Sequence, residues 1–268
     1  MCPNCRAFIH ANDRVCPYCE MQLAPSKRQL SEALSSLVPG DTFVTSLILL
    51  LNVGLYLATV TASMKAGNSN ALMGGPDGRT LLLFGAKYTD FIAMGQWWRL
   101  LTSGFLHGGL LHIFMNLYAL MDLGATVEKL YGPRRLIVIY TAATMGGFLV
   151  SALWSRNLSV GASAGLFGLL GAMLALTMKH EGPGIQEMRA SYVRYAIYGL
   201  AIGFLPGLHI DNGAHVGGLA AGFVVGWQAG LPMHGRLWME KVWSVLAWLS
   251  GGLTVAAFLR WYLWFAQA

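Results

Sequence analysis

The chain has 268 residues, of which 55% are apolar and only 11% are charged, and it carries a formal net charge of +6. This balance excludes an ordinary soluble domain, in which about a quarter of the residues are charged. It also disfavours nucleic-acid binding, because no basic stripe interleaved with aromatic residues lies on one element. We therefore expect a polytopic membrane protein.

The N-terminal residues contain all four cysteines of the chain, in two CxxC turns with ten residues between them. This spacing is typical of two knuckles that close a tetrahedral zinc site, and it resembles the zinc-ribbon modules found at protein termini. Disulfides or a redox CxxC are the alternatives, and a reducing cytoplasmic location disfavours both. We expect residues 1–24 to be a zinc-ribbon-like module and 25–41 a linker. The predicted ligands of a structural Zn²⁺ are Cys2, Cys5, Cys16 and Cys19.

Seven windows further along the chain are apolar over about 20 residues, the length that a membrane-spanning helix needs. They lie at about 43–63, 108–125, 135–154, 159–178, 191–208, 213–231 and 242–265. The second and sixth are the weakest in hydropathy, because one contains His112, Asn116 and Asp122 and the other is rich in glycine and alanine. Between the first two windows, a segment of about 45 residues is expected to lie at the bilayer interface, with Trp98 and Arg99 as anchors.

The distribution of lysine and arginine predicts the orientation, because cytoplasmic loops are enriched in both residue types. If the N-terminus is cytoplasmic, 12 of the 18 lysine and arginine residues lie on the inner side. We therefore expect a multi-pass protein of the inner (plasma) membrane with a cytoplasmic N-terminus and an external C-terminus.

Ionisable and hydrogen-bonding residues stand near the start of the second, fourth and sixth windows, which all run from outside to inside. His112 and Asn116 share one helix face, and Ser163 lies in Gly161–Gly165 near the beginning of a helix. His215 shares a face with a seam of glycines at 218, 222 and 226, which is expected to pack closely on the small residues of the fourth window. Polar groups in hydrocarbon are costly and indicate function. We interpret Ser163 as a nucleophile, His215 as its base, and His112 and Asn116 as oxyanion donors.

The structural alternative for each residue is a side chain that bonds its own backbone or a neighbouring helix. Asp211 is expected to cap a helix, and Ser159 or Asn157 to cap the helix of Ser163. Phe167 lies one turn below Ser163 and is expected to pack on the imidazole of His215.

Motifs spread over about 42–231 resemble the rhomboid family of intramembrane serine proteases. They are GQWWRLLT (95–102), FLHGG (105–109), HIFMN (112–116), GASAGLFG (161–168), AHVGG (214–218), and Glu128, Tyr131, Gly132 and Arg134. The resemblance implies a Ser163–His215 dyad without an acidic third member, oxyanion donors His112 and Asn116, and no cofactor for catalysis. Two positions depart from the family, since Ala164 replaces the glycine after the serine and Phe167 replaces a tyrosine found in some members.

We therefore expect an all-α membrane protein, a rhomboid-like bundle of six core transmembrane helices (42–231) followed by a seventh (232–268). The implied activity is cleavage of single-span membrane proteins near the outer leaflet, with 207–212 as a lid. A catalytically silent rhomboid-like binder or chaperone is the alternative. A carrier is disfavoured because its polar groups would lie near the bilayer midplane. The sequence indicates no substrate-binding residues, no nucleic-acid partner and no oligomeric state.

Overall fold

A computed structural model describes residues 4–5, 15–21, 42–182, 184–205, 210–232 and 237–267. The chain divides into two compact units, Met1–Phe43 and Val44–Ala268. The second unit is described here, and the cysteines of the first are described with the candidate sites.

The second unit is helical, and its described residues contain a helix at each of the seven predicted windows. These are α2 (Phe43–Lys65), α7 (Leu110–Ala119) continued by the π-helical turn η3 (Leu120–Gly124) and α8 (Ala125–Tyr131), α9 (Pro133–Trp154), α10 (Ser163–Lys179), α11 (Ile185–Ile202), α12 (Asn212–Ala229) and α13 (Leu237–Phe265). Residues 66–109, called the outer segment after the orientation expected from the sequence, add α3 (Ala71–Gly74), α4 (Gly78–Leu83), α5 (Thr89–Ala93), α6 (Arg99–Thr102) and η2 (Ser103–Phe105). The prediction of an all-α bundle is confirmed.

Four helices in the described part are long and apolar enough to cross a membrane, namely α2, Leu110–Tyr131, α9 and α13. Helix α10 is apolar but has only 17 residues, a length of about 26 Å. It begins at Ser163 instead of the predicted 159, because residues 155–162 form a non-helical connection. Most of the residues of α10 are buried, so protein surrounds it on several sides.

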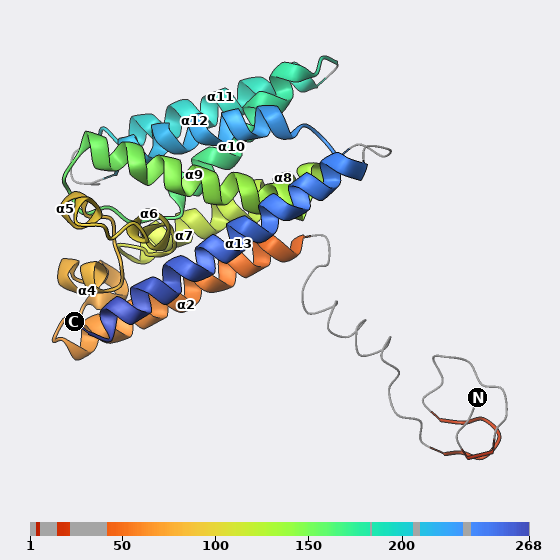
Figure 1. Cartoon of the computed structure of the whole chain (residues 1–268), viewed down its shortest axis with the longest axis horizontal. Coiled ribbons are helices and arrows are strands. Elements are labelled where there is room, and N and C mark those ends of the chain that lie inside the picture. The colour runs from red at the N-terminus through yellow and green to blue at the C-terminus, as the bar shows by residue number, and fades with distance from the viewer. Residues whose placement is uncertain are drawn as a thin grey trace. The chain divides into compact units, whose positions relative to one another are not determined.

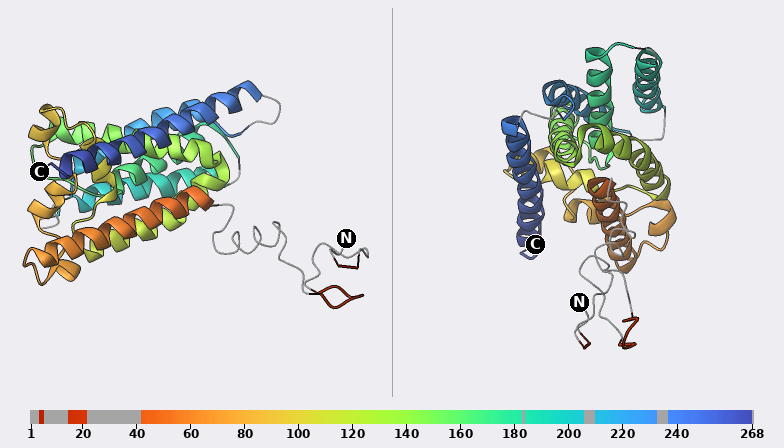
Figure 2. Two further views of the ribbon diagram at one scale, coloured as in Figure 1. Left: turned by 60° about the horizontal axis from the view of Figure 1, so that its bottom comes forward. Right: turned by 90° about the vertical axis from the view of Figure 1, so that its right-hand side faces the viewer.

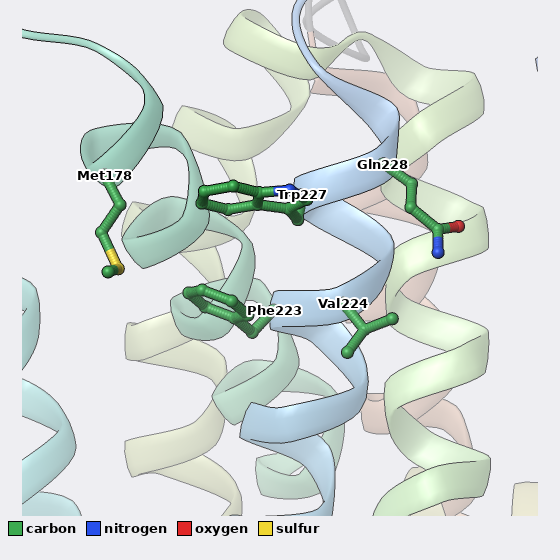
Figure 3. Close-up of a pocket in the computed structure, with 5 residues that line it drawn as sticks. All are labelled: Met178, Phe223, Val224, Trp227 and Gln228. Atoms are coloured by element: carbon green, nitrogen blue, oxygen red, sulfur yellow. The ribbon is translucent and has the colours of Figure 1, made fainter.

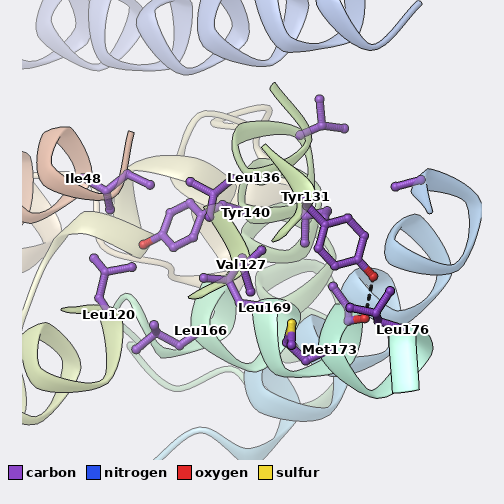
Figure 4. Packing of buried hydrophobic residues seen from close by; sticks show 14 of the residues in the cluster. Ile48, Leu120, Val127, Tyr131, Leu136, Tyr140, Leu166, Leu169, Met173 and Leu176 are labelled. Atoms are coloured by element: carbon purple, nitrogen blue, oxygen red, sulfur yellow. Dashed lines mark hydrogen bonds between the residues drawn. The ribbon is translucent and has the colours of Figure 1, made fainter. Parts of the chain in front are cut away.

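Helix α10 is the centre of the bundle, and it packs against α9, α11 and α12 (Figure 1). Helix α13 lies on the periphery, against α9 and α6 (Figures 1 and 2). The main apolar core joins α8 and α9 to α10, with Tyr140, Leu169 and Met173 among its buried members (Figure 4). Within this core the hydroxyl of Tyr131 donates to the carbonyl of Ala172 at 2.8 Å, which satisfies a buried polar group.

Glycines bring the backbones of α10 and α12 together along the predicted seam. A Cβ built on Gly222 would lie 2.0 Å from the carbonyl oxygen of Gly168, and one on Gly218 would lie 2.1 Å from that of Ala164. No side chain fits at such separations. The predicted contact between the two small-residue faces is therefore confirmed.

Charged side chains hold the ends of helices that lie far apart in sequence. The carboxylate of Glu128 accepts hydrogen bonds from the backbone amides of Val44 (2.9 Å) and Thr45 (2.8 Å), and so caps α2. The guanidinium of Arg135 pairs with Glu240 at 2.7 Å and ties α9 to α13. The sequence motif led us to single out Arg134, but Arg134 is exposed, and its neighbour Arg135 is the buried residue.

The outer segment is fastened to α13 by two contacts, and buried Arg99 also ties parts of the segment to each other. Arg99 is fully buried, donates to the carbonyls of Leu82 (2.9 Å) and Ala86 (2.7 Å), and lies over the ring of Trp264. The indole of Trp261 donates to the carbonyl of Leu83 at 2.8 Å. The predicted anchor Arg99 thus holds the segment to protein groups.

We predict that Gly222→Ala destabilises the protein by about 1–3 kcal/mol, because the added methyl group forces α10 and α12 apart. Gly252→Ala on α13 is the matched control, since a Cβ at Gly252 meets no atom within 4 Å. This control should be neutral or raise stability by about 0.5–1 kcal/mol. Thermal unfolding in detergent measures both, and equal melting temperatures would contradict the close packing.

We predict an acid-dependent contribution from Asp77, whose hydrogen bonds from Thr80 and Ser63 lower its pKa from 3.8 to about 2. Because the folded-state pKa lies below the unfolded value, this stabilisation is complete above pH 3.8 and is lost as pH falls through about 2. Asp77→Ala should therefore cost about 1 kcal/mol at pH 7, the usual value of a helix N-cap. Melting temperatures of both proteins should converge toward pH 2, and a constant difference would contradict the assignment.

Candidate active site

Ser163 is the first residue of α10, and the connection before it is held from two sides. Lys87 and Ser159 exchange backbone hydrogen bonds of 3.0 and 3.1 Å, and the amide of Gly161 donates to the carbonyl of Ser103 at 3.0 Å. The predicted caps are wrong, because the N-cap position is Ala162 and no side chain of the described residues caps α10. The first amides of α10 therefore remain available to another acceptor.

His215 lies in the first turn of α12 and meets Ser163 across the seam. Its Nε2 is 2.9 Å from the Oγ of Ser163, a hydrogen-bonding distance. The imidazole is buried, and the ring of Phe167 stacks on it with a centroid separation of 4.1 Å and an interplanar angle of 13°. This stacking, which was predicted from the sequence, fixes the plane of the imidazole.

His112 and Asn116 lie on one face of α7, and His112 borders the same space as Ser163. A Cβ built on Gly161 would lie 2.8 Å from Nε2 of His112 and 3.4 Å from Oγ of Ser163, so both atoms border the same small space. Asn116 lies one turn further along, and its amide donates to the carbonyl of His112 at 2.8 Å. In this structure Asn116 thus bonds its own helix.

His107, in the outer segment, packs against the ring of His112. The two rings meet edge to face with centroids 5.1 Å apart. His107 is fully buried, and burial together with the neighbouring His112 holds its pKa well below 6.5. His107 is therefore a neutral packing partner near the site.

Ala164, which follows the serine, is accommodated by a glycine on α9. A Cβ on Gly147 would lie 2.8 Å from the Cβ of Ala164, so the methyl group of Ala164 occupies the space that a side chain at 147 would take. Ala164 lies in the first turn of α10, and the described residues include no positive φ at this position. The helix therefore begins at Ser163 without distortion.

Among the described residues, cavities near these helices include the following two. One of about 290 Å³ lies between the far ends of α10 and α12, where Phe223 and Trp227 extend toward Met178 (Figure 3). Its lining contains no nucleophile or base, so it is remote from the candidate chemistry.

The other cavity, of about 660 Å³, lies beside the start of α12 and is bordered by Ile210, Asp211 and Asn212. The rest of the predicted lid, residues 207–209, lies outside the described residues. Asp211 caps α12 as expected, with Oδ1 accepting from the amide of Ala214 at 3.0 Å.

Three of the four predicted zinc ligands come together in the first unit. The sulfur atoms of Cys5, Cys16 and Cys19 lie within 4.8 Å of one another, and those of Cys5 and Cys16 are 3.6 Å apart. Thiolates on one tetrahedral Zn²⁺ lie about 3.8 Å apart, given Zn–S bonds of about 2.3 Å. The three sulfurs therefore fit one metal ion, and Cys2 lies outside the described residues.

Comparison with known proteins gives the family. A family model described as the Rhomboid domain matches residues 94–231. The rhomboid protease GluP of Bacillus subtilis (strain 168) is 38% identical over 173 residues, which are 65% of this chain and 34% of GluP. Rhomboid-like protease 2 of Toxoplasma gondii is 31% identical over 242 residues, 87% of this chain and 82% of that protein.

An inactive relative is also similar, because Inactive RHOMBOID-like protein 8 of Arabidopsis thaliana is 33% identical over 203 residues, 68% of this chain and 57% of that protein. The chain spans about a third of the length of GluP and somewhat more than half of the Arabidopsis protein. The Rhomboid domain covers half of the chain, and the Toxoplasma relative aligns over most of both proteins. The chain belongs to the rhomboid family of integral membrane proteins.

Proposed function

We propose that this protein is an intramembrane serine endopeptidase with Ser163 as nucleophile and His215 as general base. The observation that carries the proposal is the 2.9 Å contact between Nε2 of His215 and Oγ of Ser163, made by two separate helices. In this geometry the imidazole accepts the hydroxyl proton as the serine oxygen attacks a peptide carbonyl. The same imidazole then protonates the leaving amine, and water later releases the acyl group.

His112, Asn116 and the amide of Ser163 are the proposed donors to the oxyanion. The space bordered by Nε2 of His112 and Oγ of Ser163 lies at the start of α10, where the positive end of the helix dipole favours a developing negative charge. Asn116 contributes if its amide turns from the carbonyl of His112 toward this space. Catalysis by this set of groups requires no cofactor.

The proposed substrates are membrane-anchored proteins with a single span. In the orientation indicated by lysine and arginine, the starts of α10 and α12 face the outer leaflet, so cleavage takes place near the outer end of a substrate helix. Peptide carbonyls inside a helix are already hydrogen-bonded, so the substrate must unwind locally. Small or helix-breaking residues at the outer end are the expected preference.

A silent rhomboid-like binder is the second candidate, since one similar protein is named inactive. Both members of the dyad are present here and lie within hydrogen-bonding distance, which favours the protease.

We predict that Ser163→Ala and His215→Ala each lower cleavage of a model single-span substrate by more than about a thousandfold without loss of folding. His112→Ala should cost about a hundredfold or more, as expected for one oxyanion donor. The measurement is turnover by the purified protein in detergent. His180→Ala, at the exposed far end of α10, is the matched control. Cleavage that persists in Ser163→Ala would reject the nucleophile.

We also propose that residues 1–24 bind one structural Zn²⁺ through Cys2, Cys5, Cys16 and Cys19, with 25–41 as a linker to the rhomboid core. So short a segment has little apolar core, so the metal would supply most of its folding free energy. We predict about one zinc per full-length chain by elemental analysis. Cys16→Ser should lose the metal while Ser163→Ala keeps it, and zinc-free wild-type protein purified without chelator would contradict the site.

A further inference from the structure

Ser151, in the last turn of α9, forms hydrogen bonds with two residues of opposite charge, Asp211 and Lys87. It is fully buried, and its hydroxyl donates to Oδ2 of Asp211. Its carbonyl accepts a hydrogen bond from Nζ of Lys87 at 3.2 Å. One residue of α9 therefore joins the outer segment to the start of α12.

Asp211 links Ser151 to the main chain of His215. Its Oδ1 accepts from the amide of Ala214 at 3.0 Å, and its carbonyl accepts from the amide of His215 at 3.1 Å. The main chain of His215 is thus bonded directly to the residue that Ser151 holds. Movement of Asp211 would carry the imidazole with it.

Lys87 links Ser151 to residues 155–159, which lead to Ser163. Its Nζ also donates to the carbonyls of Ser155 (2.5 Å) and Asn157 (3.1 Å), which follow the end of α9. Its main chain exchanges two hydrogen bonds with Ser159, four residues before Ser163. Lys87 therefore fixes the path of residues 155–159.

Lys87 is a buried cation, and Asp211 supplies a negative charge near it. The side chain of Lys87 is fully buried, and none of the described carboxylates lies within salt-bridge distance of it. Burial lowers the pKa of Lys87, and the negative charge of Asp211 opposes this shift. Asp211 is therefore the counter-charge to a buried cation, and a buried cation without one is costly.

We propose that Lys87, Ser151 and Asp211 form a charge-compensated clamp at the end of α9 that positions Ser163 and His215 relative to each other. These three are positioning residues, and the inference rests on the proposed protease function. Asp211 in this clamp does more than cap a helix. A cap alone needs no charge, because asparagine caps helices as well as aspartate does.

Asp211→Asn tests this difference, because asparagine keeps the cap and removes the charge. Ser151→Ala removes the link, and Ser151→Thr restores the hydroxyl. Asp90→Asn is the matched control, since among the described residues the Asp90 carboxylate forms only an exposed pair with Arg156, at 3.7 Å. Ser244→Ala is the second control, since that hydroxyl bonds only the carbonyl of Glu240 in its own helix, at 2.7 Å.

Three quantities are measured on the full-length protein well below the melting temperature of every variant. They are the rate at which a fluorophosphonate labels Ser163, kcat and KM for a model substrate, and hydrogen exchange of residues 155–162 and 212–218. Asp211→Asn and Ser151→Ala should lower labelling and kcat about tenfold or more, with KM within about twofold, and should speed exchange in both segments. The double variant Asp211→Asn/Ser151→Ala should have a labelling rate and kcat no lower than those of the more impaired single variant. Ser151→Thr should regain the wild-type labelling rate and kcat, and both controls should match wild type.

If Asp211→Asn is labelled at the wild-type rate, the clamp is overturned. Slower labelling without faster hydrogen exchange in either segment would also overturn it. Additive losses in the double variant would also contradict it. If wild-type protein is never labelled but the clamp variants exchange faster, the protease proposal fails and the clamp stands. Hydrogen exchange measures the order of the two segments and does not depend on catalysis.

Discussion

The close approach of α10 and α12 is the constraint on which the rest of the structure depends. Gly222 faces the backbone of Gly168, and Gly218 faces that of Ala164, at separations that leave no room for a side chain. Ser163 directly precedes Ala164 on one helix, and His215 precedes Gly218 by one turn on the other. The dyad contact is thus a geometric consequence of the seam. Without interhelical close packing, a serine and a histidine on separate helices would be held only by their own hydrogen bond.

A second constraint comes from the helix ends, whose unpaired backbone groups find no water in hydrocarbon. Three charged residues bind such groups at helix ends. Glu128 accepts from the first amides of α2, and Asp211 caps α12. Lys87 donates to the carbonyl of Ser151 in the last turn of α9 and to that of Ser155 just beyond it. The Asp211 cap lies within the start of α12, whereas Glu128 joins α8 to α2 and Lys87 joins the outer segment to the end of α9, so these two contacts place α2 and the outer segment beside the central helices.

The sequence predicted those features that have a local period or a composition signal. The seven helices follow from the apolar composition of their windows, and the glycine seam follows from spacing along the sixth. The stacking of Phe167 on His215 follows from the position of Phe167 one turn below Ser163. The burial of Lys87 was not predicted, because its partners are backbone carbonyls more than 60 residues away. Every residue has a backbone carbonyl, so the sequence does not mark which ones bind Lys87. The start of α10 was placed four residues early for a related reason, since bonds to Ser103 and Lys87 hold 159–161 extended.

The uncapped start of α10 contrasts with α4 and α12, each of which is capped by an aspartate side chain. An aspartate or serine at position 162 would stabilise α10 by about 1 kcal/mol. It would also occupy the first amides with a permanent acceptor and place its side chain beside the space bordered by His112 and Ser163. Gly161, with φ of +140°, keeps the other side of that space free of a Cβ. On the proposed mechanism this local instability is functional, because amides that lack an acceptor in the resting protein bind most strongly to the charge that develops during the reaction.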